Sequence, residues 1–256
     1  MQNKMEKIKV SCVSYLNSKP FIFGFNNFPE LKKYMELDLD IPSVCAKKLI
    51  ENKVDIGLVP VAILNRMNNY EIISDYCIGT NGNVKSVNLY SEVPIEEIKE
   101  IILDFHSQSS ITLAKVLSKF YWKKDIKFIS ADENYIENIL GTTAGVVIGD
   151  RTFGMENSYK FIYDLSTEWR DFTGLPFVFA CWVANKKIIH PEFLIKFNEA
   201  LKFGMEHKSE VIAILKLEPQ YQKIDLENYL NHCIDYNLDD SKKLAMQKFL
   251  DYSVNI

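Results

Sequence analysis

Short apolar runs alternate with segments of helical periodicity along most of the chain, and this alternation constrains the fold more than any other sequence feature. Early in the chain, apolar runs at residues 8–14, 37–42 and 55–59 have the pattern of strands, and residues 45–52 have that of a helix. A β-α-β-α-β order of this kind predicts a mainly parallel sheet with helices on both faces. The chain is therefore predicted to be an α/β protein.

Two further strand patterns end this first unit, and the alternation then continues in a second unit. Strand patterns at 72–80 and 84–90 flank a strong turn signal at Asn81-Gly82-Asn83. The second unit then has a brief helix at 94–99, strands at 100–104, 127–130 and 144–148, and helices at 110–122 and 133–140. The apolar run at 175–183 indicates a strand that returns to the first unit, and residues 191–215, 226–232 and 239–252 are helical.

One sheet unit interrupted by another indicates two lobes joined by crossovers near residues 90–94 and 179–184. Lobe 1 would comprise 1–92 and 181–256, including a helical C-terminal tail, and lobe 2 would comprise 93–180. This layout resembles the type II periplasmic-binding-protein-like fold, in which hinge closure encloses a ligand in a central cleft.

Composition excludes several classes of function. The 256 residues carry a formal net charge of -4 without a basic patch, so we expect no nucleic-acid partner. We expect no membrane association, because no apolar run approaches a membrane span. The polar N-terminus lacks the apolar core of a secretory signal, which predicts a cytoplasmic protein. Oligomeric state is left open.

The sequence also predicts neither a metal nor a cofactor. No cluster of His, Cys and carboxylate residues has metal-ligand spacing, and there is no glycine-rich phosphate loop or dinucleotide fingerprint. The five cysteines are widely spaced, and Cys12, Cys77 and Cys181 lie in strand patterns, which predicts buried, unpaired thiols. Trp169, Trp182 and the nearby Phe177 and Phe179 are expected in the core.

Polar residues follow several predicted strands at their carboxyl ends, where ligands bind in open α/β sheets. One group lies after the first strand and another at the start of the helix near residue 110; they are Ser14, Asn17 and Ser18, and Ser107, Ser109 and Ser110. A helix N-terminus offers free N–H groups to an anion. The alternative for the serines and Asn17 is simple helix capping.

A third group, Asp150, Arg151 and Thr152, follows the strand at 144–148. Arg151 can bind a carboxylate with two parallel hydrogen bonds, or form an ion pair at the surface or between the lobes. Asp104 and Asp150 are candidate bases, although an Asp that ends a strand often accepts hydrogen bonds from a turn.

Several segments, in order over about the first 185 residues, resemble the chorismate dehydratase family of the futalosine route to menaquinone. They are Val13-Ser14-Tyr15-Leu16-Asn17-Ser18-Lys19-Pro20, Asp55-Ile56-Gly57-Leu58-Val59-Pro60, Cys77-Ile78 with Lys85-Ser86-Val87, Asp104 with Ser107, Ser109 and Ser110, Ile148-Gly149-Asp150-Arg151, and Tyr163-Asp164-Leu165 through Trp182. The chain departs from the family at Gln108 and Lys85, where Arg is usual, and at Asn81-Gly82-Asn83. The helical tail carries no motif.

The resemblance implies that the protein eliminates water from chorismate, a dianion, to give 3-[(1-carboxyvinyl)oxy]benzoate without a cofactor. Asn17 and Ser86 are the candidate catalytic residues, which orient the substrate and hydrogen-bond the developing charge and the departing hydroxyl. The other candidates, Ser14, Ser18, Ser107, Ser109, Ser110, Asp150, Arg151 and Thr152, would bind the substrate. Because the product is aromatic, positioning and water exclusion can suffice, and the substrate's own enolpyruvyl carboxylate can accept the proton.

Two other functions remain open. One is a solute-binding protein of the same fold without chemistry. The other is the later naphthoate-forming synthase of the same route, a family that resembles this one but uses a His base in its second lobe. This chain has only His106 in that lobe.

Overall fold

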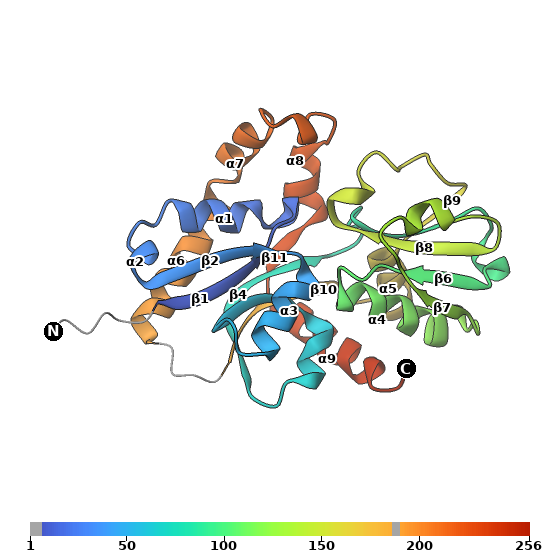
Figure 1. Ribbon diagram of the computed structural model, residues 1–256, viewed down its shortest axis with the longest axis horizontal. Helices are drawn as coiled ribbons and strands as arrows, with labels where there is room; N and C mark the ends of the chain where they lie inside the picture. The colour runs from blue at the N-terminus through green and yellow to red at the C-terminus, as the bar shows by residue number, and fades with distance from the viewer. Residues whose placement is uncertain (1–6, 186–189) are drawn as a thin grey trace.

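Two β-sheets, one in each of two neighbouring lobes, organise the part of the chain that the computed structural model describes, residues 7–185 and 190–256 (Figure 1). The described strands form a six-stranded sheet in the order β11-β4-β10-β3-β1-β2 and a five-stranded sheet in the order β7-β6-β8-β5-β9. Helices pack around both sheets (Figure 1). The predicted two-lobed α/β architecture is confirmed.

The lobe 1 sheet is mixed. Its strands are β1 (Ile8–Val13), β2 (Met35–Asp40), β3 (Ile56–Pro60), β4 (Tyr70–Thr80), β10 (Phe177–Asn185) and β11 (Asp235–Asn237). β1 pairs in parallel with β2 and β3, as predicted. β10 pairs antiparallel with both β3 and β4, and β11 pairs antiparallel with β4. A mainly parallel sheet was expected, but only two of these five strand pairings are parallel. The difference arises because β10, which returns from the other lobe, and β11 join the sheet in the antiparallel direction.

Lobe 1 is covered by helices from both ends of the chain. They are η1 (Leu16–Ser18), α1 (Lys19–Asn26), α2 (Leu31–Tyr34), α3 (Pro42–Ile50), η2 (Val61–Arg66), α6 (Pro191–Glu206), α7 (Lys208–Leu215), η7 (Pro219–Tyr221), α8 (Leu226–Asn228), η8 (Tyr229–Cys233) and α9 (Asp240–Ser253). α1 and α6 cross closely at Gly24 and Gly204, where an added Cβ would lie 2.0 Å from a backbone oxygen of the other helix. Asp239 caps α9 by accepting from the backbone N–H of Lys242 at 2.9 Å.

Lobe 2 contains the middle of the chain. Its elements are β5 (Val87–Ser91), η3 (Ile95–Glu97), β6 (Glu100–Leu103), α4 (Gln108–Val116), η4 (Leu117–Trp122), β7 (Lys127–Ser130), η5 (Tyr135–Asn138), β8 (Thr143–Ile148), η6 (Gly149–Thr152), β9 (Phe161–Asp164) and α5 (Leu165–Thr173). The helix expected at 133–140 is only the short 3-10 turn η5. β9 and α5 were not predicted.

Both predicted lobe boundaries are wrong by several residues. β5 pairs with β8 and β9 in the lobe 2 sheet, so the chain crosses before residue 87 and not near 90–94. The turn at 81–83 therefore joins strands of different sheets. The return falls between α5 and β10, at 174–176, and not at 179–184. An apolar run predicts a strand, but nothing in it marks which sheet the strand joins.

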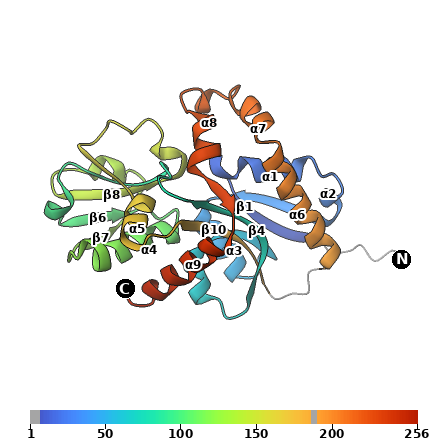
Figure 2. The same ribbon diagram turned by 180° about the vertical axis from the view of Figure 1, so that it is seen from behind.

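The C-terminal helix α9 bridges the two lobes (Figure 2). Its Phe249 lies edge-on to Trp169 of α5, with ring centroids 5.9 Å apart, and to Phe177 of β10, 4.9 Å apart. The predicted aromatic core residues and all five cysteines are buried, and the cysteines are free. No helix in residues 7–185 and 190–256 is long and apolar enough to cross a membrane.

Candidate functional site

A small cavity of about 40 Å³ lies where the two lobes meet. Four of its lining residues were predicted as site residues: Asn17, Ser86, Ser107 and Ser110. The other lining residues are mostly apolar; they are Val13, Tyr15, Pro42, Pro60, Ile78, Val84, Val87, Ile148, Gly149, Phe179 and Ala180. Since one water needs about 10–15 Å³ of such space, the lobes are closed in this structure. A ring-sized ligand requires them to separate.

Ser86 lies in the first crossover, directly before β5, and is 2 % exposed. Its Oγ is 2.8 Å from the hydroxyl of Tyr229, which donates to it. Tyr229 begins η8 in the C-terminal tail and is also buried. Burial raises the pKa of the Tyr229 phenol, so it stays protonated. Tyr229 could not be predicted as a site residue, because a lone tyrosine in a helical segment has the pattern of an ordinary core residue.

Asn17 lies in η1, the turn between β1 and α1. Its Oδ1 accepts from the hydroxyl of Ser18 at 3.1 Å, and its backbone oxygen accepts from the hydroxyl of Tyr236 at 2.9 Å. Ser18 is fully buried and does not line the cavity; instead of binding substrate it supports Asn17. Ser14 is also outside the cavity lining, and its backbone N–H donates to Asp40.

The N-terminus of α4 faces the cavity. Ser107 caps this helix by accepting from the backbone N–H of Ser110 at 3.4 Å, and the Ser110 hydroxyl donates to Ser107 Oγ at 3.2 Å. Ser109 points elsewhere: its hydroxyl donates to the backbone oxygen of Phe179 at 2.8 Å and accepts from the N–H of Ala62 at 3.2 Å. Ser109 thus joins α4 to lobe 1 and has no proton left for a substrate carboxylate.

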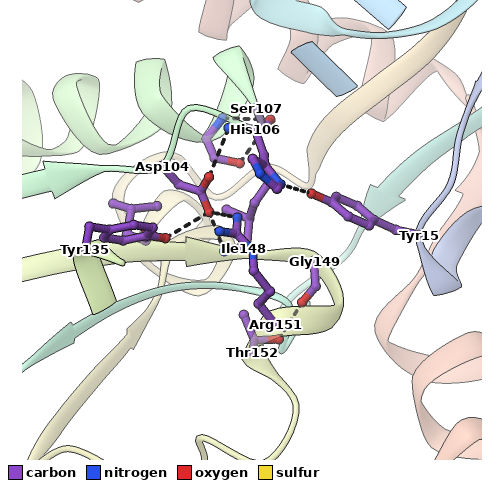
Figure 3. Close-up of polar contacts among 11 residues, drawn as sticks. Tyr15, Asp104, His106, Ser107, Tyr135, Ile148, Gly149, Arg151 and Thr152 are labelled. Atoms are coloured by element: carbon purple, nitrogen blue, oxygen red, sulfur yellow. Dashed lines mark hydrogen bonds and ion pairs between the residues drawn. The ribbon is translucent and has the colours of Figure 1, made fainter. Parts of the chain in front are cut away.

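Asp104 is fully buried beneath the cavity and accepts four hydrogen bonds (Figure 3). Its donors are the backbone N–H groups of His106 (2.9 Å) and Ile148 (3.2 Å), the hydroxyl of Tyr135 (3.0 Å) and the guanidinium of Arg151. Three of these donors bond Oδ2 and one bonds Oδ1, and Asp104 is not among the residues that line the cavity. Asp104 is a structural centre of lobe 2 and not a base in this arrangement.

Arg151 is turned into lobe 2, toward Asp104, and does not line the cavity (Figure 3). Its partner Asp104 is fully buried and belongs to the same lobe, so the ion pair does not join the two lobes. The Arg151 side chain is partly exposed, and its Nε has no hydrogen-bond partner among the described residues. In place of the predicted contact with substrate, Arg151 binds the protein's own carboxylate.

Asp150 and Thr152 also serve structural contacts. Both carboxylate oxygens of Asp150 accept from the backbone N–H of Leu16 in lobe 1, at 3.0 and 3.2 Å. Burial raises the pKa of Asp150, and the hydrogen bond from Leu16 opposes that rise. Thr152 is buried and donates to the backbone oxygen of Gly149 at 2.9 Å. Neither residue lines the cavity.

Tyr15 and His106 form a contact across the lobe interface that the sequence did not predict (Figure 3). The Tyr15 hydroxyl is 2.5 Å from Nδ1 of His106, and the two rings are stacked. Gly149, at φ +65, admits the tyrosine ring, because a Cβ there would lie 2.7 Å from it. Burial lowers the pKa of His106, and the nearby charge of Arg151 lowers it further against the opposing effect of Asp104.

Polar contacts therefore hold the lobes closed at several points. Besides the contacts of Tyr15, Leu16 and Ala62, the backbone N–H of Ser43 donates to the backbone oxygen of His106 at 2.9 Å. In the part of the chain that the structure describes, no group of three or more His, Cys, Asp or Glu side chains could hold a metal ion.

Solved structures of similar fold share the two-lobed layout. A protein from Archaeoglobus fulgidus aligns with a TM-score of 0.75 at 15% identity, over 100% of this chain and 98% of that one. A Candida albicans protein described as having the generic periplasmic binding protein structural fold aligns with a TM-score of 0.67 at 12% identity, over 98% and 91% of the two chains. The periplasmic-binding-protein-like fold predicted from the sequence is thus confirmed.

Sequence relatives are more specific. The chain is 23% identical to a chorismate dehydratase from Thermus thermophilus, over 91% of this chain and 95% of that protein. It is 26% identical to a chorismate dehydratase from Campylobacter jejuni, over 93% and 94% of the two chains. Residues 8–255 match the family described as menaquinone biosynthesis. A match over nearly the whole chain shows that this protein belongs to the menaquinone biosynthesis family.

Proposed function

We propose that the protein is a chorismate dehydratase, a hydro-lyase that converts chorismate to 3-[(1-carboxyvinyl)oxy]benzoate in the futalosine route. The observation that carries this proposal is the chemistry of the inter-lobe cavity. Its polar lining consists of neutral groups, including Asn17, Ser86, Ser107 and Ser110, and no carboxylate or imidazole lines it among the described residues. Such a site suits a dianion that must be held and shielded, and whose reaction needs no strong protein base.

The N-terminus of α4 is suited to one substrate carboxylate. The N–H groups of a first helical turn and the positive end of the helix dipole favour an anion there, and the Ser107 hydroxyl, whose oxygen accepts from Ser110, adds a donor. No acidic side chain among the described lining residues opposes this charge. The negatively charged candidates of lobe 2, Asp104 and Asp150, are both bonded to protein donors instead.

The elimination breaks the C3–H and C4–O bonds of chorismate, and the ring becomes aromatic. The C3 proton passes to the enolpyruvyl carboxylate of the substrate itself. The carboxylic acid so formed then returns this proton to the C4 oxygen as the C4–O bond breaks, so that one water leaves and the carboxylate is regenerated. Ser86 and Asn17 donate hydrogen bonds to the charge that develops on the departing oxygen. Closure of the lobes excludes solvent and holds the reactive conformer, and such positioning supplies much of a rate enhancement of this kind.

The principal alternative is a solute-binding protein, which the fold and the closing lobes equally support. A synthase with a second-lobe His base is less well supported. His106 contacts Tyr15 and is not among the described residues that line the cavity. A cytoplasmic location stays a prediction.

Turnover of chorismate tests the proposal. The purified protein is incubated with chorismate, with and without EDTA, and the products are examined by mass and ultraviolet spectra. We expect a product lighter by one water with an aromatic spectrum, formed equally in both samples. Chorismate that is bound but returned unchanged would identify a solute-binding protein. Activity lost with EDTA and restored by a divalent ion would contradict the metal-independent mechanism.

A further inference from the structure

The C-terminal tail brings a buried phenol against Ser86, one of the two candidate catalytic residues. Tyr229 is 2 % exposed, and its hydroxyl lies 2.8 Å from Ser86 Oγ. Ser86 comes from the first crossover and Tyr229 from η8. Phe153, just after η6 of lobe 2, lies edge-on to the Tyr229 ring with centroids 5.1 Å apart, which fixes the ring in place.

The direction of this hydrogen bond defines the roles of the two hydroxyls. The phenol has one proton, and that proton is donated to Ser86 Oγ. Burial raises the pKa of Tyr229, so the phenol keeps the proton that it donates.

Ser86 is the acceptor in this contact. Its oxygen accepts from Tyr229, so its own proton must point to another acceptor. Ser86 lines the inter-lobe cavity, where the proposed substrate would supply one. We propose that Tyr229 is a positioning residue that holds the Ser86 hydroxyl as a donor into the cavity. This inference rests on the proposed dehydratase function.

The consequence is preorganisation of the donor that meets the leaving group. A serine hydroxyl that rotates freely presents its lone pairs as often as its proton, and lone pairs repel an oxygen that gains negative charge. If the orientation of the Ser86 hydroxyl is fixed before the reaction, the hydroxyl does not have to reorient during the reaction step. η8 is a π-helix, and such segments frequently occur at functional sites. Burial adds a constraint, since the phenol is stable here only while its hydrogen bonds are made.

Tyr229→Phe tests the inference because it keeps the ring and removes only the hydroxyl. We expect kcat for chorismate to fall roughly tenfold, the effect of losing one ordinary hydrogen bond in the transition state. KM should change by less than about twofold, because the bond acts on developing charge and not on the bound ground state. Tyr159→Phe is the matched control: it also removes a phenol donor, one that bonds the backbone of Ile136 at 3.1 Å in lobe 2, away from the cavity lining. It should leave kcat and KM unchanged.

A double variant separates positioning from packing. If Tyr229 acts through Ser86, Tyr229→Phe has no further effect on kcat in the Ser86→Ala background. Equal losses in both backgrounds would overturn the inference, as would an unchanged kcat in the single variant. If Tyr229→Phe does not fold, Phe153→Leu tests the same contact, because it removes the ring that packs against Tyr229 and so loosens the phenol. It should lower kcat only when Ser86 is present, and an unchanged kcat would overturn the inference.

The wild-type protein distinguishes failure of the function from failure of the inference. Wild type that returns chorismate unchanged overturns the proposed function and this inference with it. Active wild type, with Tyr229→Phe equally active, overturns the inference alone and leaves the dehydratase in place.

Discussion

Asn17 carries both a donor and an acceptor to the edge of the cavity, and its acceptor is already occupied by Ser18. Replacing it by Ala removes a donor to charge that develops during elimination, so turnover should fall more than binding. Asn17→Asp should do no better, because it removes the donor and repels a dianion. Single-turnover rates compared with substrate dissociation constants decide this, and an unchanged chemical rate in a folded Asn17→Ala variant would remove Asn17 from the mechanism.

Asp104 has the opposite character, since its role is to hold lobe 2 together. Asp104→Ala leaves a partly buried guanidinium and two backbone N–H groups without their acceptor, whereas the Tyr135 hydroxyl keeps the backbone oxygen of Val146. Removing one partner of a buried ion pair costs about 3–5 kcal/mol, and we expect the lower end because the Arg151 side chain is 31% exposed. Urea unfolding measures this loss. A stable variant without turnover would instead restore Asp104 as a base.

At the scale of elements, α4 offers a comparison between adjacent serines. The sequence predicted that both Ser109 and Ser110 bind substrate. In the structure Ser110 lines the cavity, whereas Ser109 bonds lobe 1. Ser110→Ala removes the hydroxyl that donates to Ser107 Oγ, and so releases the Ser107 hydroxyl that would meet the substrate carboxylate. It should raise the dissociation constant of chorismate by up to roughly tenfold, as expected for one ordinary hydrogen bond of about 0.5–1.5 kcal/mol. Ser109→Ala should affect thermal stability more than affinity. Equal affinities in wild type and Ser110→Ala would leave Ser110 as part of the helix cap alone.

Local patterns predicted most of the elements but not their partners. Alternation and periodicity correctly indicated β1, β3, β6, β8 and α4, because these features depend on neighbouring residues. The pairing of β5 with β8 and β9, and the antiparallel position of β10, depend on contacts between segments far apart in sequence. Four cavity residues could be predicted because they lie within short local motifs; they are Asn17, Ser86, Ser107 and Ser110. Tyr229 could not be predicted, since it contacts Ser86 across 143 positions of the chain.

At the scale of the whole molecule, His106 makes closure depend on pH. In the closed state burial and Arg151 lower the His106 pKa below its usual value, against the effect of Asp104. The unfolded chain therefore binds the proton more readily, so this contribution to stability is complete above about pH 6.5 and is lost as pH falls through the lowered pKa. Protonation of Nδ1 also removes the acceptor of the Tyr15 hydroxyl.

Melting temperatures between pH 7.5 and 5.5 measure this effect. Wild type should lose more stability over that range than His106→Asn, which does not titrate. The comparison isolates His106, because the raised pKa of Asp150 contributes equally to both proteins and with the opposite sign. Parallel curves for the two proteins would show that the Tyr15–His106 contact is insensitive to protonation.

The discontinuous lobe 1 also determines when the protein can become active during its synthesis. Every strand of the lobe 2 sheet precedes residue 165, whereas the lobe 1 sheet needs β10 and β11, and Ser86 needs Tyr229. Domains generally fold as units while the ribosome is still translating. The middle of the chain can therefore fold before the beginning does, and the proposed site is completed only after residue 229 has emerged. A nascent chain that stalls before that point can fold lobe 2 but lacks the contact of Tyr229 with Ser86, so the proposed reaction would begin only with an almost finished polypeptide.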